Sequence, residues 1–145
     1  FAAADTSNYG RVKPGDVVYT KSPTGCFPYG IVKQNWMDEE VAVSPLYGVY
    51  TPVSKDAGYL LHTYFEQSQN ANNYIRTLAQ KGAKNTINIT TSHFLDKSII
   101  FPSNEDCVSH LAKMFAVISA EISLAEKELE LLLRQRKTLL QQLFI

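Results

Sequence analysis

Apolar residues recur along this chain in two different rhythms, and the change falls near residue 103. Before it, short apolar runs are separated by turn signals such as Lys13-Pro14-Gly15-Asp16. After it, apolar positions follow one another at three- and four-residue spacing, and there is no Gly or Pro after Pro102. The first rhythm is typical of short strands and turns, and the second is typical of one long amphipathic helix.

Short runs rich in β-branched residues, bounded by Gly and Pro, predict strands in the first part. These runs cover residues 17–19, 31–33, 41–43, 46–50, 87–90 and 99–101, and the third and fourth are one broken strand or two. A helical pattern covers residues 59–80, and Gly82 is expected to end that helix. The mixture predicts an α+β fold, with a small curved or mixed β-sheet and a flanking helix, over residues 1–103.

The second part, residues 104–145, predicts a single helix over 105–143. Ser103, with Asp106 three positions later, fits a capping box at its start. At about 1.5 Å per residue the helix is about 58 Å long. A domain of about 100 residues, with a radius of gyration of about 13 Å, cannot cover that length. The distal half is therefore expected to meet another helix, in the same parent chain or in a second copy.

Apolar residues at heptad spacing form a seam along this helix, and only Arg136 interrupts it. The seam residues expected to contact a partner helix are Ile118, Ile122, Leu129, Leu132, Arg136, Leu139 and Leu143. Arg136 is expected to set the register or to contact the partner. Leu131-Leu132-Leu133 places leucine on three sides of the helix, so we expect a further partner to grip the helix pair.

Composition describes a globular protein without a strong overall charge. The chain has 14 basic and 14 acidic side chains, so the formal net charge is zero, which excludes a polycationic tail but not a local basic patch. Cys26 and Cys107 are far apart and are expected to be free thiols of a cytoplasmic protein. No apolar run approaches the roughly 20 residues of a membrane span. Because residue 1 is Phe rather than Met, we expect a fragment whose natural start was removed.

Residue patterns that would support catalysis are missing from the sequence. His62, His93 and His110 are scattered, and none stands at metal-ligand spacing with Cys, Asp or Glu. The sequence has neither a glycine-rich phosphate loop nor a nucleophile elbow. It therefore predicts a protein that is not an enzyme and binds neither a cofactor nor a metal.

One long stretch favours contact with DNA. Residues 67–95 contain no acidic side chain, and lysines there suit phosphate contacts while Asn and Thr suit base edges. The candidates in this stretch are Lys81, Lys84, Asn85, Asn88 and Thr90. A second set lies in and beside loops nearer the start of the chain: Lys21, Ser22, Tyr29 and Lys33. The plain alternative is that these are ordinary surface lysines and polar loops of a neutral domain.

The order of several short segments resembles the target recognition domain of the DNA-specificity subunit of type I restriction–modification enzymes. The segments are Lys13-Pro14-Gly15-Asp16-Val17-Val18-Tyr19, Pro28-Tyr29-Gly30-Ile31-Val32, Val43-Ser44-Pro45-Leu46-Tyr47, Lys81-Gly82-Ala83, Ile87-Asn88-Ile89, Phe94, Ile99 and Phe101-Pro102. The stretch from Leu132 to Phe144 is similar to the spacer helix of that family. The resemblance covers nearly the whole chain.

The resemblance implies a subunit without an active site of its own. Such subunits typically carry two recognition domains, each reading one half of a split DNA target, and two antiparallel helices hold these domains apart and bind the methyltransferase subunits. S-adenosylmethionine, ATP and Mg²⁺ belong to the methyltransferase and restriction subunits of the assembled enzyme, not to this chain.

The chain departs from that family in having one recognition domain and one long helix, and its match begins partway into the domain. A half-subunit or a cut piece is therefore expected, and its long helix is expected to pair in antiparallel orientation with a second copy or with a second half of the subunit. The rival interpretation is a non-catalytic oligomerisation module, in which a small α+β domain carries a coiled-coil stalk and has no role on DNA. A catalytic methyltransferase is excluded, because the sequence lacks its Gly-rich cofactor loop and its Asn-Pro-Pro-aromatic motif.

Overall fold

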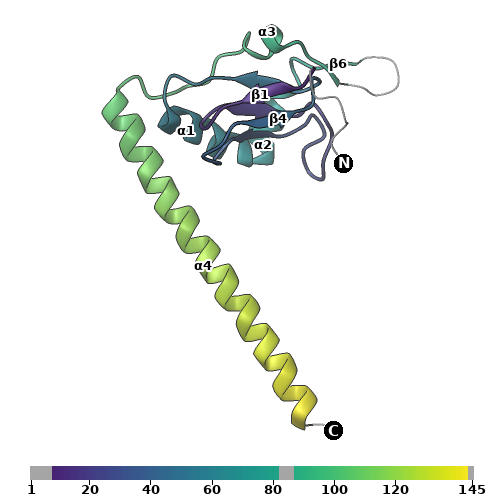
Figure 1. Cartoon of the computed structure of the whole chain (residues 1–145), viewed down its shortest axis with the longest axis vertical. Coiled ribbons are helices and arrows are strands. Elements are labelled where there is room, and N and C mark those ends of the chain that lie inside the picture. The colour runs from purple at the N-terminus through teal and green to yellow at the C-terminus, as the bar shows by residue number, and fades with distance from the viewer. Residues whose placement is uncertain (1–7, 82–86, 144–145) are drawn as a thin grey trace.

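A computed structural model describes residues 8–81 and 87–143. It confirms the α+β fold class: short antiparallel strands and three short helices form a globular part, from which one long helix projects (Figure 1). β2 (Val17–Tyr19) lies between β3 (Val32–Gln34) and β5 (Gly48–Tyr50), and β1 (Gly10–Val12) pairs with β4 (Val41–Val43). β6 (Gln80–Lys81) and β7 (Ile87–Asn88) form a separate two-stranded ladder. All of these pairs are antiparallel, and the predicted strands at 41–43 and 46–50 are two strands.

The predicted turn before β2 is present, and contacts among its own residues stabilise it. The Asp16 carboxylate, buried at the end of the turn, accepts a hydrogen bond from the backbone N–H of Lys13 at 2.8 Å. Gly15 takes a φ of +91°, a left-handed conformation that side chains with a Cβ rarely adopt. The turn therefore sets the direction of β2 and places Val17 and Tyr19 in the core.

The main core is aromatic and joins the central sheet to the later segments. Tyr19 of β2 stacks on Phe94, with ring centroids 4.7 Å apart, and Phe65 and Tyr74 pack around the same ring. Ile75 and Ile89 are fully buried beside them. Residues from four distant parts of the chain thus meet at Phe94, and each fully buried side chain of this size contributes roughly 1.5–3 kcal/mol.

The single helix predicted over residues 59–80 is wrong, because two helices occupy this region. α1 (Lys55–Glu66) begins earlier, since Ser54 Oγ accepts a hydrogen bond from Ala57 N–H and caps it. Extended backbone at Gln67 separates α1 from α2 (Ser68–Ile75), and Asn70 donates to the free carbonyl of Tyr64. The Ser- and Asn-rich sequence there favours caps over helix interiors. Gly82, the predicted stop, lies outside the described residues.

Two further segments differ from the sequence prediction. Residues 99–101 form no strand: Ile99 packs against the main core, Phe101 packs beside the contact between α1 and α4, and Ile100 is fully exposed. The strand predicted over 87–90 ends at Asn88, after which Ile89 enters the core and Thr90 begins the short helix α3 (Thr91–Phe94). The pattern of apolar residues alone could not distinguish a paired strand from a segment that places single apolar side chains in the core without a ladder.

The long helix α4 spans Glu105–Leu143. Its cap is Asn104 rather than the predicted Ser103: Asn104 Oδ1 accepts from the N–H groups of Asp106 and Cys107, at 2.8 and 3.4 Å. The first turns pack on α1, where Val108 and Ala112 are buried against Ala57 and Leu60. Every residue from Ala116 to Leu143 is exposed, and Figure 1 shows this part running clear of the globular part.

Candidate nucleic-acid interface

The loop between β2 and β3, together with β3 itself, carries the second set of predicted DNA contacts. Backbone hydrogen bonds within the loop define its conformation. Thr20 N–H donates to the Ile31 carbonyl, and Thr24 and Phe27 exchange two backbone hydrogen bonds of 2.8 and 3.0 Å. Gly30 has a φ of +96°, and a Cβ there would lie 3.0 Å from the backbone nitrogen of Lys21. This close approach fixes how the two sides of the loop meet.

The four candidates of this set differ in what they can offer a ligand. Ser22 is exposed near the tip of the loop, and Lys33 is exposed on β3. Lys21 is half-buried at a φ of +55°. Tyr29 is half-buried too, and its carbonyl accepts a 2.6 Å hydrogen bond from the hydroxyl of Tyr19. The structure therefore gives Tyr29 a packing role, and leaves Ser22 and Lys33 as the freely accessible members.

The first set lies on the β6–β7 ladder and on α3. Lys81 pairs with Ile87, and Asn88 pairs with Gln80, so Lys81 and Asn88 belong to the same hairpin. Lys84 and Asn85 lie outside the described residues. The acid-free stretch therefore places two of its predicted contacts on one ladder, directly before α3.

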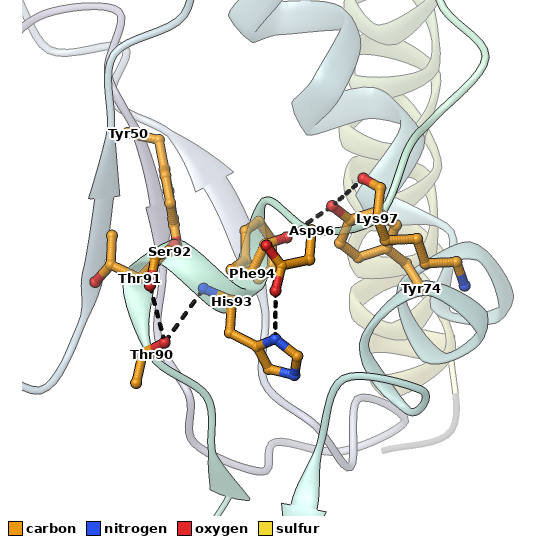
Figure 2. A network of polar contacts seen from close by, with 9 residues as sticks. All are labelled: Tyr50, Tyr74, Thr90, Thr91, Ser92, His93, Phe94, Asp96 and Lys97. Atoms are coloured by element: carbon orange, nitrogen blue, oxygen red, sulfur yellow. Dashed lines mark hydrogen bonds and ion pairs between the residues drawn. The ribbon is translucent and has the colours of Figure 1, made fainter.

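Thr90 has a definite structural task at the start of α3 (Figure 2). Its Oγ1 accepts from His93 N–H at 3.2 Å and lies 3.2 Å from Ser92 Oγ. The hydroxyl of Tyr50 donates to the Thr91 carbonyl at 3.2 Å and ties α3 to β5, while burial raises the pKa of Tyr50 to about 12. Thr90 and Ser92 remain exposed. The side chains of Thr90 and Ser92 thus lie at the surface, while the hydrogen bond from Tyr50 fixes the backbone of α3 to β5.

The sequence analysis missed a histidine–carboxylate pair between α3 and the bend that follows it. His93 Nδ1 lies 2.6 Å from Asp96 Oδ2. A carboxylate accepts, so Nδ1 carries the proton, and Nε2 is left free to meet a ligand as an acceptor or, when the ring is charged, as a donor. The available signal was the spacing: Thr90 stands three residues before His93 as its cap, and Asp96 three residues after it.

The segment after α3 is pinned to α2. The hydroxyl of Tyr74 lies 2.7 and 2.8 Å from the carbonyls of Phe94 and Lys97, and burial raises the pKa of Tyr74 (Figure 2). Lys97 Nζ donates to the Asn73 carbonyl at 2.7 Å and sits 5.5 Å from the centre of the Tyr74 ring. Lys97 is thereby engaged within the fold and is a weak candidate for a phosphate contact.

Tyr19 links the two sets of candidates. Its hydroxyl holds the carbonyl of Tyr29 in the β2–β3 loop, and its ring stacks on Phe94 at the end of α3. In the described part of the chain no hydrogen bond joins the loop directly to α3. In Figure 1, α3 and β6 lie away from the corner where α1 meets the start of α4. The candidate DNA contacts and the long helix thus occupy different parts of the molecule.

A buried histidine anchors α1 on β3, the strand that carries the candidate Lys33. His62 Nδ1 accepts from Gln34 N–H at 3.4 Å, and the indole of Trp36 covers the imidazole edge-on with a centroid distance of 4.6 Å. Nε2 lies 3.2 Å from a Glu66 carboxylate oxygen but is not aligned to hydrogen-bond it. Burial lowers the pKa of His62, opposed by Glu66 and assisted by the charge of Lys33. This arrangement is structural, because the ring is not accessible.

A groove of about 380 Å³ between the central sheet, α1 and residues 95–101 is lined almost entirely by apolar side chains. Such a lining suits neither phosphate nor the edges of bases. Within residues 8–81 and 87–143, no group of three or more His, Cys, Asp or Glu side chains could hold a metal ion.

The predicted partner surface of α4 lies fully at the surface. Ile118, Ile122, Leu129, Leu132, Arg136, Leu139 and Leu143 are all exposed. By length and composition α4 also qualifies as a candidate membrane span. That indication is weak, because a single helix of this kind is weak evidence for a membrane span and because the first turns of α4 pack on α1.

Comparisons of the chain with protein-family models, with curated proteins and with solved structures find no match.

Proposed function

We propose that the globular part recognises double-stranded DNA, as a target recognition domain of a type I restriction–modification specificity subunit. In this function the chain has no catalytic role, and it positions methyltransferase and restriction subunits on a bipartite DNA site. The proposal rests on two things. The first is the resemblance in the order of the turn and strand segments, and the second is the position of the candidate DNA contacts in the fold.

One observation carries the proposal. The first part of the acid-free stretch forms α2, and its later described part forms the β6–β7 ladder and α3, which lie away from the start of α4. Lys81 and Asn88 are on the ladder, and exposed Ser92 and the half-exposed His93 follow on α3. Lysines there would neutralise phosphates, while Asn, Ser and His side chains would hydrogen-bond to base edges or sugar. A duplex could dock on this region without meeting α4.

In this proposal α4 is a spacer. A rigid helix fixes the distance between two DNA-reading modules, and that distance sets the separation of two half-sites. The leucines outside the seam would contact methyltransferase subunits, which would explain why apolar side chains surround the helix on several sides: Leu124, Leu131, Leu133 and Leu140.

The test measures how binding of the full chain to a mixed-sequence DNA duplex depends on salt. Fluorescence anisotropy gives the Kd at KCl concentrations between about 50 and 200 mM. Each lysine that neutralises one phosphate contributes about 0.9 to the slope of log Kd against log salt. Lys84→Ala and Lys33→Ala are each expected to weaken binding to every sequence and to lower that slope by about one.

The matched control is Lys113→Ala, because Lys113 is an exposed lysine on α4, away from the proposed interface. It should leave both affinity and slope as they are. Equal losses in all three variants would indicate a general charge effect rather than an interface, and an absence of salt-dependent binding would remove the proposal.

The second candidate function is an oligomerisation module without a DNA role. It is favoured by the exposed apolar face of α4, which needs a partner whether or not the globular part binds DNA. Self-association together with no retention on DNA or heparin at low salt would decide for this candidate.

A further inference from the structure

A single acidic side chain stands between Glu66 and Glu105 in the sequence, and the fold pairs it with a histidine. The acid is Asp96. Its Oδ2 lies 2.6 Å from His93 Nδ1, and the side chains of His93 and Asp96 are 36 % and 63 % exposed. A carboxylate on a surface that meets phosphates weakens binding by repulsion unless it serves another group there. The contact with His93 gives Asp96 such a role at the proposed interface.

His93 is held through its backbone as well as through its ring. Its N–H donates to Thr90 Oγ1 at 3.2 Å, and the next residue, Phe94, is buried and stacks on Tyr19 in the main core. The hydrogen bond from Tyr50 to the carbonyl of residue 91 fixes α3 to β5. A side chain that is fixed by its own contacts loses little conformational freedom when it meets a ligand. The imidazole is therefore preorganised for binding.

The carboxylate determines which ring nitrogen His93 presents to a ligand. Asp96 can only accept, so Nδ1 carries the proton, and in the neutral ring Nε2 keeps its lone pair and has no hydrogen. In Figure 2 the dashed contact to Asp96 reaches one nitrogen of the ring, and the other nitrogen points away from the residues drawn. Nε2 of the neutral ring is therefore a hydrogen-bond acceptor at the surface of α3.

An acceptor in the major groove distinguishes among the four bases. Adenine and cytosine present amino groups there, at N6 and N4, whereas guanine presents the acceptors N7 and O6 and thymine presents the acceptor O4. A neutral imidazole that offers a lone pair would bind an amino group and be repelled by guanine. When the ring takes up a second proton, both nitrogens donate, and guanine becomes the preferred base.

The other titratable groups that face α3 keep their charge over the range in which a histidine changes its own, between about pH 5 and 8. Tyr50 of β5 and Tyr74 of α2 are neutral there, because burial raises the pKa of Tyr50 to about 12 and also raises the pKa of Tyr74. Lys97 Nζ is directed to the carbonyl of residue 73, at 2.7 Å. Among the described residues, Asp96 is thus the group that acts on the ring of His93.

We propose that His93 reads a base edge in the major groove of the DNA target through Nε2, and that Asp96 is the positioning residue that makes Nε2 an acceptor in the neutral ring. The chain then selects a base with an amino group, adenine or cytosine, at one position of its target when His93 is neutral, and guanine when the ring is charged. This inference rests on the proposed function and deepens it, because it names the class of base that one side chain recognises.

The first step can be tested without DNA. Two-bond ¹H–¹⁵N correlation spectra of the histidine rings at about pH 8 report which nitrogen carries the proton, and His93→Gln assigns the signals of His93. In the wild type His93 is expected to be protonated at Nδ1. Asp96→Asn is expected to give a mixture of both tautomers, because an amide can donate as well as accept. The matched control is Asp106→Asn, which removes an exposed carboxylate at the start of α4 and should leave the ring of His93 unchanged.

The second step is tested by selection from a library of DNA duplexes with a randomised central segment. The fraction that the full chain binds is sequenced at about pH 8 and at about pH 5.5. One position should favour adenine or cytosine over guanine about tenfold at the higher pH and reverse at the lower pH. Asp96→Asn should reduce this preference to about two- to threefold and keep the rest of the selected sequence, and His93→Gln should abolish it. Asp106→Asn should select the same sequence as the wild type.

Three results would overturn the inference: a wild-type His93 protonated at Nε2, a selected sequence that Asp96→Asn and His93→Gln leave unchanged, or a base preference that is the same at both pH values. If lower pH strengthens binding equally for all sequences and steepens its salt dependence, His93 contacts a phosphate instead. A chain that binds no duplex would remove the proposed function as well. Sequence-specific binding that ignores both variants would remove this inference alone.

Discussion

The two halves of α4 share one hydrophobic pattern and differ completely in burial. In the first turns, Val108 and Ala112 are buried against α1, with relative exposures of 7 % and 4 %. Further along, Ile122 and Leu129 stand two and three heptads after Val108 and are more than half exposed. The difference teaches that heptad periodicity specifies which face of a helix is adhesive, whereas the partner that covers that face must come from elsewhere.

The contrast also separates two kinds of stability. Burial of the first turns belongs to the folding of one chain, because α1 is part of the same globular unit. Burial of the distal seam belongs to association and depends on concentration. A substitution in the first turns of α4 should therefore change the free energy of unfolding. The same substitution in the distal half should change the affinity for a partner or have no effect.

Val108→Asp is the strongest way to test this separation. It places a carboxylate in the contact between α4 and α1, so the free energy of unfolding should fall by about 3–5 kcal/mol. Urea denaturation followed by tyrosine and tryptophan fluorescence measures the change. The matched substitution is Val117→Asp, at a site on α4 that is 58 % exposed and off the seam.

Val117→Asp should change the free energy of unfolding by less than about 0.5 kcal/mol. If both variants lose stability equally, the packing of α4 on α1 contributes nothing specific, and the two halves of the helix do not differ as the structure indicates.

The same contrast explains which parts of the fold could be predicted from the sequence. The 39 residues of α4 form a helix over the predicted span, because nothing in that long periodic stretch competes with helix formation. The break at Gln67 was missed because it depends on Asn70, whose side chain donates to the carbonyl of Tyr64, and the early start of α1 was missed because it depends on the cap at Ser54. The strand predicted at 99–101 is wrong for a related reason: Ile99 and Phe101 pack on the globular part without a neighbouring strand, and Ile100 is exposed.

The candidate site was predictable in composition but not in role. The absence of acidic residues over 67–95 pointed to a region, and the structure places Thr90 at a helix cap within it. His93 was set aside as an isolated histidine, because its partner Asp96 comes close only through the turn of α3. Tyr29 was read as a ligand contact, yet its carbonyl serves the core through Tyr19. The type of each residue was enough to suggest candidates. Which of them cap a helix or pack in the core depends on the backbone geometry, which the sequence pattern did not reveal.

Lowering the pH should reduce the free energy of unfolding of the globular part, whereas the distal half of α4 should not be affected. The pKa of His62 is lowered by burial, so the unfolded chain binds a proton more readily than the folded chain. The stability associated with neutral His62 is complete above the ordinary pKa of about 6.5 and is lost as the pH falls below it. The expected slope is at most about 1.4 kcal/mol per pH unit.

Urea denaturation of wild type and His62→Gln, compared between about pH 7 and pH 5, measures this contribution. The variant should show a shallower dependence on pH. The control is His110→Gln, because His110 is exposed on α4 and faces no buried environment. A dependence on pH that survives in His62→Gln would assign the effect to other groups, among them Glu66.

The smallest expected effect concerns the residue at which α4 begins. Asn104→Ala removes the side-chain acceptor for the N–H groups of Asp106 and Cys107, and should lower the free energy of unfolding by about 1 kcal/mol. Ser103→Ala is the matched variant, because the sequence pattern alone names Ser103 as the cap while the structure gives it no such contact. Thermal unfolding of both variants compares the two assignments. A loss at Ser103 with none at Asn104 would return the cap to the sequence prediction and shift the start of α4 by one residue, and with it the rotation at which Val108 and Ala112 meet α1.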